Sequence, residues 1–150
     1  MEITRKYDLS ELSESILKSR GTYALMVDID HMMQINDEIS HEAGDAAIAA
    51  TASRIGRSTE PGMTVFRTGG DEFVVITNTR DAGEAEAVAK KIISFADEDV
   101  KWNGGTFKFT LSVGVARIPE SGGAEEAMKA ADAAMYKVKK ENRGGFHRAD

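Results

Sequence analysis

The chain has 150 residues, and its 41% hydrophobic and 29% charged residues are ordinary for a water-soluble protein with one core, so we expect a single domain over 1–150. A formal net charge of −6 disfavours a nucleic-acid polymer as partner, because phosphate neutralisation needs a basic surface. The absence of cysteine excludes thiolate chemistry and disulfides. The sequence has no signal-peptide pattern and no long apolar run, so we expect a cytoplasmic protein and no membrane contact from this segment.

The N-terminal residues predict a helical lead-in followed by a buried strand. Residues 1–20 are polar but place four apolar side chains at helical spacing, which predicts a short amphipathic helix; these are Leu9, Leu12, Ile16 and Leu17. The run "TYALMVDID" (22–30) is apolar and closes on two acids. That pattern is typical of a buried strand that ends at a surface.

A helical stretch follows this strand, and its apolar face holds Met32, Ile35 and Ile39. Gly44 interrupts the helical pattern. Asp45 then precedes "AAIAATASRIGR" (46–57), so we expect Asp45 to be the N-cap of a second helix.

Two apolar runs in the middle of the chain predict a hairpin. "MTVF" (63–66) and "FVVIT" (73–77) flank the pair Gly69–Gly70 and the acids Asp71 and Glu72. The glycines permit a tight turn and leave room for a ligand. Taken alone, the two acids are better explained by solvation of the turn than by a bound cation.

The second half of the chain predicts two helices around a strand. Residues 81–99 are amphipathic, "NGG" (103–105) marks a turn, and 107–115 alternates strictly, as a half-buried antiparallel strand does. The alanine-rich stretch 124–141 predicts a last helix. The fold class is therefore α+β, with a central, mainly antiparallel (mixed) sheet flanked by helices.

Four acids stand at the ends of the predicted strands. Asp28 and Asp30 close one strand, and Asp71 and Glu72 occupy the hairpin turn. If the strands are neighbours, the carboxylates converge, and each raises the pKa of the others unless a cation joins them. Mg²⁺ accepts such oxygen ligands and shares its remaining positions with phosphates. Each acid also has a plain alternative, as a turn residue or a helix cap.

Several segments in one order carry a family resemblance. "TGGDEF" (68–73) and "DIDHMMQINDEISHEAGD" (28–45) resemble two signatures of the GGDEF family, the diguanylate cyclases. "LSVGVA" (111–116) and "ADAAMYKVKKENR" (131–143) are similar to its later segments. The resemblance spans nearly the whole chain and implies a fold like the palm of nucleotidyl cyclases and polymerases.

The resemblance implies an enzyme that joins two GTP molecules into cyclic di-GMP and releases pyrophosphate. Asp28 and Asp71, with the main chain of Ile29, would bind Mg²⁺ or Mn²⁺, and Glu72 would position the metal or activate the ribose 3′-hydroxyl. Joining two substrates symmetrically implies two facing copies of the domain. Because the chain shows no strong dimerisation element, we expect a transient or weak homodimer.

The same resemblance implies the substrate-binding residues. Main-chain N–H groups of the turn after Asp30, at His31, Met32 and Met33, would meet the phosphates. The guanine and the triphosphate would be bound by two further pairs, Asn36 with Asp45 and Lys139 with Arg143. Each pair also has a simpler explanation. Asn36 can be a surface residue of a helix and Asp45 a helix N-cap. Lys139 and Arg143, spaced i, i+4, can be two cations on one helix face that complement the helix dipole.

Three segments depart from the family pattern. Met32–Met33 replaces Phe-Lys, and losing that cation would cost about 1.5–3 kcal/mol, roughly tenfold to a hundredfold in binding or rate. The family's N-terminal motif has become "YDLSELSES" (7–15), and "EPGM" (60–63) replaces the product-inhibition motif Arg-x-x-Asp. We therefore expect no feedback inhibition through 60–63. A GTP-binding regulatory module that no longer catalyses is the alternative function, and a purely structural domain is a third.

Overall fold

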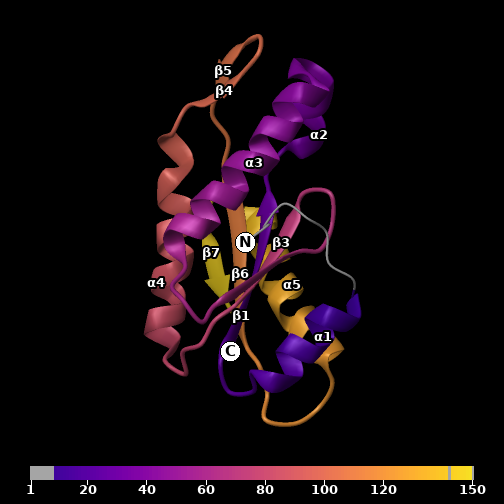
Figure 1. Cartoon of the computed structure of the whole chain (residues 1–150), viewed down its shortest axis with the longest axis vertical. Helices are drawn as coiled ribbons and strands as arrows, with labels where there is room; N and C mark the ends of the chain where they lie inside the picture. The colour runs from indigo at the N-terminus through magenta and orange to yellow at the C-terminus, as the bar shows by residue number, and fades with distance from the viewer. Residues whose placement is uncertain (1–8, 142, 150) are drawn as a thin grey trace.

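A five-stranded mixed sheet forms the centre of the computed structural model, which describes residues 9–141 and 143–149 (Figure 1). The strand order is β2-β3-β1-β6-β7, and only the β6–β7 pair is parallel. The strands are β1 (Tyr23–Ile29), β2 (Thr64–Arg67), β3 (Glu72–Ile76), β6 (Leu111–Arg117) and β7 (Phe146–Arg148). The predicted fold class is confirmed.

Helices cover both faces of this sheet (Figure 1). On one face lie α3 (His41–Ser58) and α4 (Ala82–Ile93), and on the other lie α1 (Leu9–Lys18) and α5 (Ala124–Glu141). Shorter pieces are α2 (Met32–Gln34), a π-helical turn (Ile35–Ile39), a 3₁₀ turn (Ser94–Asp97), and a small hairpin of β4 (Val100–Trp102) and β5 (Gly105–Phe107). No helix among the described residues is long and apolar enough to cross a bilayer.

The alternation of β1 divides the core into two layers. Leu25 and Val27 pack against α3 and α4, whereas Ala24 and Met26 pack against α1 and α5. Successive side chains of a strand point to opposite faces, so Asp28 continues the row on the α5 side. The strand therefore delivers this carboxylate to the end of α5.

The predicted strand 107–115 is wrong in its extent and its exposure. β5 ends at Phe107 and β6 begins at Leu111, with an irregular link between them. β6 is buried on both faces up to Ala116, because a helical layer covers each side of the sheet. The short strands β4 and β7 were not predicted, because three residues are too few to show a period.

Ser40, and not the predicted Asp45, caps α3. The backbone of Ser40 is extended, and its hydroxyl accepts a hydrogen bond from the N–H of Ala43 at 3.0 Å. The helix therefore begins at His41 and runs through Gly44, which does not interrupt it. Asp45 is an exposed residue early in α3, without a capping role.

The predicted N-terminal helix is present from Leu9 to Lys18, and the first part of the predicted range 1–20 lies outside the described residues. Leu12 and Ile16 are buried against α5, as the spacing predicts. Leu17 is exposed. The hairpin of β2 and β3 and the helix 124–141 are confirmed with nearly the predicted bounds.

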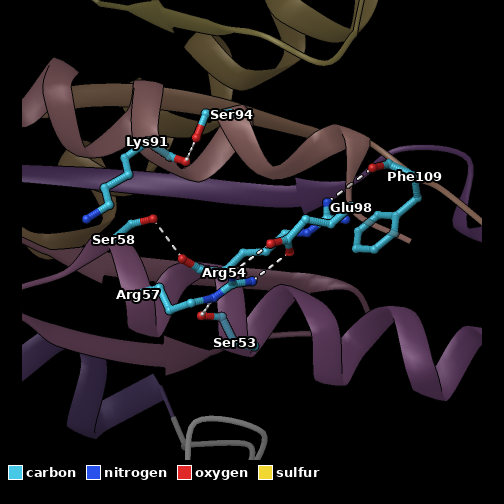
Figure 2. A network of polar contacts seen from close by, with 8 residues as sticks. All are labelled: Ser53, Arg54, Arg57, Ser58, Lys91, Ser94, Glu98 and Phe109. Carbon is cyan, nitrogen blue, oxygen red and sulfur yellow. Dashed lines mark hydrogen bonds and ion pairs between the residues drawn. The ribbon is translucent and has the colours of Figure 1, made fainter. Parts of the chain in front are cut away.

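A buried arginine holds the β5–β6 link against α3 (Figure 2). The Arg54 Nη1 donates to the Phe109 carbonyl at 3.1 Å, and the guanidinium lies 4.0 Å from the centroid of the Phe109 ring. Arg57, one turn on, pairs with both carboxylate oxygens of Glu98 at 2.7 Å. These contacts fix the segment that leads into Thr110 at the end of the sheet.

Close packing of α5 on β6 requires Gly114. A Cβ at this position would overlap the Ala131 carbonyl and the Met135 N–H. We predict that Gly114→Ala lowers the free energy of unfolding by about 1–3 kcal/mol, because backbone atoms cannot yield to the added methyl group. Urea unfolding measures the change. Gly123→Ala, which adds a methyl group in open space, is the control and should stay within about 0.5 kcal/mol; equal midpoints for both variants would contradict the packing argument.

Candidate functional site

Three polar side chains form a row across the sheet beneath the end of α5. In the strand register Asp28 lies opposite Glu72 on one side and opposite Ser112 on the other. Neighbouring positions on paired strands point to the same face, so all three face the α5 layer. The prediction that the strand 22–30 and the hairpin are neighbours is confirmed.

Lys139 reaches into this row from the last turns of α5. Its ammonium lies 3.1 Å from Asp28 Oδ2 and 3.1 Å from Asp30 Oδ1. It also donates to the carbonyl of Ile29 at 3.3 Å. A single cation therefore bridges the two acids and the main chain between them.

Asp30 is a fully buried carboxylate whose oxygens are all engaged. The hydroxyls of Thr110 and Ser112 donate to it at 2.6 and 2.7 Å, and the Gly144 N–H donates at 2.9 Å. With Lys139 added, four donors surround this side chain. Asp30 is therefore a structural residue that ties β1 to β6 and to the turn after α5.

Asp28, by contrast, keeps one buried oxygen without a partner. Its Oδ2 meets Lys139, but Oδ1 has no hydrogen-bond donor among the described residues. Burial raises the pKa of Asp28 to about 6, and the carboxylates of Asp71 and Glu72 push it in the same direction. Lys139 opposes the shift without cancelling it. An acid with an unengaged oxygen and a raised pKa is ready for another cation.

Glu72 opens β3 beside Asp28 and is held by Thr68 across the turn. The Thr68 hydroxyl donates to Glu72 Oε1 at 3.0 Å. Burial raises the pKa of Glu72, with further contributions from Asp132 on α5 and from Asp71. Thr68 and Asp132 were not singled out by the sequence, because only the fold brings them to the acid.

The hairpin turn is held by its own arginine. The Arg67 guanidinium donates to the carbonyls of Gly69 and Gly70 at 3.2 and 2.9 Å, and the Asp71 carbonyl accepts from the Ile29 N–H at 3.1 Å. This bracing gives Arg67 a role that its sequence position did not reveal.

The two turn glycines are not required by the turn itself. Neither Gly69 nor Gly70 has a positive φ. An added Cβ at Gly70 would meet no atom within 4 Å, and one at Gly69 would only touch Glu72. The prediction that the turn needs glycine for its backbone conformation is therefore wrong. The prediction that the glycines leave room for a ligand beside the acids stays a prediction.

Asn36 lies against the backbone of α3 at Gly44, the residue before Asp45. A Cβ at Gly44 would overlap the Asn36 Oδ1, so the amide lies directly against the backbone of α3 beside Asp45. Asn36 is half-buried on the π-helical turn, and Asp45 is exposed. The predicted pair therefore lies on neighbouring segments, with Asp45 next in the chain to the residue that Asn36 contacts.

The segment from His31 to Met33 joins this pair to the acids. His31 has a left-handed backbone, φ 59°, and leads into α2. Met33 is 76% exposed, and Met32 is partly buried against the core. His31 and His41 are exposed and Trp102 is partly buried.

Arg143 does not share a helix face with Lys139, so the i, i+4 prediction is wrong. α5 ends at Glu141, and Arg143 lies beyond it with φ 55°, its N–H donating to the Val138 carbonyl at 2.8 Å. The chain reverses here so that the Gly144 N–H reaches Asp30 and β7 can pair with β6. Arg143 is exposed near the same end of α5.

The described residues do not form a ready-made metal cage. No group of three or more His, Cys, Asp or Glu side chains among them converges on one point. Two carboxylates and a main-chain carbonyl are a smaller set, and Asp28, with its unpartnered Oδ1, together with the carbonyl of the next residue, Ile29, offers oxygens of the kind such a set needs. The donor oxygens present are therefore compatible with a hard divalent cation.

An α+β sheet with acids at one end and helices on both faces is the palm architecture, and comparisons agree with it. A family model described as "Diguanylate cyclase, GGDEF domain" matches residues 5–145. Diguanylate cyclase A of Treponema denticola is 35% identical over 137 residues, 90% of this chain and 37% of that protein. The GGDEF domain of TpbB (YfiN) from Pseudomonas aeruginosa superposes with a TM-score of 0.84 at 30% identity, covering 94% of this chain and 86% of that one.

A further solved structure is the GGDEF domain of DgcB from Caulobacter crescentus in complex with c-di-GMP, with a TM-score of 0.83 at 28% identity over 94% of this chain and 85% of that one. The chain belongs to the GGDEF family. It spans between 16% and 65% of the length of several curated relatives that it matches.

The raised pKa of Asp28 predicts a pH-dependent stability in EDTA. A folded-state pKa of about 6 lies above the ordinary 3.8, so the folded protein binds this proton more tightly than the unfolded chain. Ionised Asp28 therefore destabilises the fold above pH 6, and this loss is recovered as the pH falls toward 4. Between pH 7.5 and pH 5, the stability of the wild type relative to Asp28→Asn should rise by about 1 kcal/mol.

Urea unfolding of both proteins at the two pH values measures this difference. Asp99→Asn, which removes an exposed carboxylate paired with Lys108, is the control and should show a much smaller pH effect. If the free energies of unfolding of the wild type and Asp28→Asn differ by the same amount at pH 5 and at pH 7.5, the prediction is contradicted.

Proposed function

We propose that this chain is a diguanylate cyclase domain that joins two GTP molecules into cyclic di-GMP and releases pyrophosphate. The observation that carries the proposal is the buried, unpartnered Asp28 Oδ1 in a row with Glu72 and next to the turn acid Asp71. Clustered carboxylates of this kind are unfavourable alone and favourable around a divalent cation. Diguanylate cyclase A and the c-di-GMP complex of DgcB add support by similarity.

Asp28, Asp71 and the Ile29 carbonyl would hold Mg²⁺ or Mn²⁺ together with the substrate phosphates. When bound, the metal supplies positive charge against the charge that develops on the reacting phosphate and the leaving pyrophosphate. Asp28 must be ionised for this role, and its pKa of about 6 leaves it mostly ionised at pH 7.5. The carbonyl of Ile29 is fixed by β1, which hydrogen-bonds on both sides.

Glu72 would accept or guide the proton of the ribose 3′-hydroxyl. Its pKa is raised by burial, and a base with a raised pKa holds a transferred proton better. Thr68 orients the carboxylate through the hydrogen bond to Oε1. Room beside Gly70 would allow the nucleotide to approach this edge of the hairpin.

Asn36 and Asp45 would bind the guanine. A carboxylate accepts from the guanine N1–H and N2–H₂, a pattern that adenine does not offer, and an amide serves a purine acceptor. The absence of a capping role for Asp45 leaves its carboxylate available. Main-chain N–H groups from His31 to Met33 and the cations Lys139 and Arg143 would meet the triphosphate.

Each domain would hold one GTP, so two copies must face each other to join two nucleotides. A homodimer with two-fold symmetry satisfies this requirement, because each site then supplies one 3′-hydroxyl and one α-phosphate. We propose that this dimer is transient or weak and that the substrate stabilises it.

The second candidate function is a GTP-binding regulatory module with impaired catalysis. One observation favours it: Met33, an apolar side chain that is 76% exposed, stands where the family pattern has a cation. Saturable GTP binding without pyrophosphate release would identify this function. We further propose that cyclic di-GMP does not inhibit through 60–63, where Glu60 offers negative charge and nearby Arg57 is already paired with Glu98.

We predict that the protein, incubated with GTP and Mg²⁺ at high concentration, produces cyclic di-GMP, and that Asp71→Ala lowers the rate by about a hundredfold or more. The loss follows from removing one of two carboxylate ligands. Chromatography of the products measures the rate. Asp99→Ala, which removes an exposed acid that lies just before β4 and pairs with Lys108, is the control and should retain activity. Product formation by Asp71→Ala at the wild-type rate would refute the assignment.

We predict that Asp45→Ala raises the KM for GTP by roughly tenfold to a hundredfold, the loss of a charge-assisted contact. Its thermal midpoint should stay close to that of the wild type, because Ser40 and not Asp45 caps α3. Glu42→Ala, an exposed acid in the same helix, is the matched control for charge. A destabilised Asp45→Ala with an unchanged KM would restore the capping interpretation.

A further inference from the structure

Lys139 contacts two of the groups that the proposed metal needs: the Asp28 carboxylate, through Oδ2, and the Ile29 carbonyl. Its ammonium lies within 3.1 to 3.3 Å of Asp28 Oδ2, Asp30 Oδ1 and the Ile29 carbonyl. The side chain is 18% exposed, so this contact is largely shielded from water. The groups around the ammonium are all oxygens, and two of them are the ones assigned to the metal.

An ammonium and a divalent cation compete for such a position. Mg²⁺ binds its oxygens at about 2.0–2.1 Å and tolerates little distortion of its octahedral geometry. A second cation in contact with the same carboxylate and carbonyl would meet both steric overlap and charge repulsion. Binding of one cation therefore disfavours the other.

We propose that Lys139 is a tethered cation that fills the metal position while no nucleotide is bound and moves to the triphosphate when the metal–nucleotide complex arrives. This inference rests on the proposed function, because it takes the metal and GTP sites as assigned there. It gives the lysine two sets of anionic partners, one in each state. Metal and nucleotide then bind together, because the phosphates offer the ammonium a place to go.

The surroundings of Lys139 allow such a move. Its side chain leaves the last turns of α5, and the four-carbon stem of a lysine is flexible enough to place the ammonium in more than one position. Asp30 stays satisfied without it, since Thr110, Ser112 and the Gly144 N–H still donate to the carboxylate. Asp28 Oδ1 has no donor among the described residues, so Asp28 would be the acid exposed to the metal.

The proposal has a measurable consequence for metal binding without nucleotide. If the lysine fills the position about nine-tenths of the time, the apparent affinity for free metal falls about tenfold, in proportion to the vacant fraction. Removing the ammonium should restore that affinity. A charge elsewhere on α5 should have little influence.

The experiment is a Mn²⁺ titration of the nucleotide-free chain, with the free Mn²⁺ measured by electron paramagnetic resonance. Lys139→Met should bind Mn²⁺ about tenfold more tightly than the wild type. Lys140→Met is the matched control: it removes the same charge from the next residue, whose ammonium is exposed and lies 5.4 Å from the Tyr136 ring centroid. It should bind Mn²⁺ within about twofold of the wild type.

Lys139→Gln repeats the test with a side chain that is neutral but still donates a hydrogen bond to the acids, in case the methionine variant does not fold. Tighter Mn²⁺ binding by either folded Lys139 variant, relative to Lys140→Met, supports the proposal. Equal or weaker binding by the Lys139 variants overturns it.

A parallel titration with an unreactive GTP analogue separates this inference from the proposed function. In the wild type the analogue should strengthen Mn²⁺ binding, and in Lys139→Met this gain should be smaller, because no ammonium has to be displaced. If the analogue has no effect on any protein, the assigned GTP site fails. The comparison of Lys139 with Lys140 variants in the absence of nucleotide still decides the role of the lysine.

Discussion

Asp30 places a carboxylate in the interior of the protein, and two chain segments far from it in the sequence, 110–112 and 139–144, converge on it. The start of β6 supplies two hydroxyls, the turn after α5 supplies the Gly144 N–H, and α5 itself supplies Lys139. A buried charge without these donors would be strongly unfavourable, so the segments are held together by the need to satisfy it. The end of β1, and with it Asp28, takes its position from this arrangement.

Much of the fold followed from periodicity and needed no other information. The alternation of β1, the hairpin of β2 and β3, and the helix from Ala124 to Glu141 all have patterns long enough to be unambiguous. The pattern misled at 107–115, where strict alternation suggested one solvent-facing side. Ser112 is polar yet fully buried, because it serves Asp30 and not water. A sequence does not state which partner a polar side chain will find.

The candidate site was predictable in its residue types and less so in its geometry. The acids at the ends of two strands indicate a shared edge, and the register of Asp28 with Glu72 bears this out. The capping rule failed because two residues, Ser40 and Asp45, both precede helical sequence and both have side chains that can cap a helix. In the structure the hydroxyl of Ser40 makes the capping hydrogen bond. The reversal of the chain at Arg143, with φ 55°, serves a contact to Asp30 that no local pattern reveals.

Asp28, near the end of β1, and Asp30, just beyond the strand, lie two residues apart, yet Asp30 serves stability and Asp28 is available for chemistry. Asp30 has a hydrogen-bond donor for each carboxylate oxygen, so all its interactions are made within the fold. Asp28 keeps a buried oxygen without a donor among the described residues and has its pKa raised to about 6, so Lys139 offsets its charge only in part. The hairpin repeats this contrast, since neither Gly69 nor Gly70 is required by backbone conformation. These features, which the fold does not need, lie at the ends of two neighbouring strands, and the proposed metal and nucleotide site rests on them.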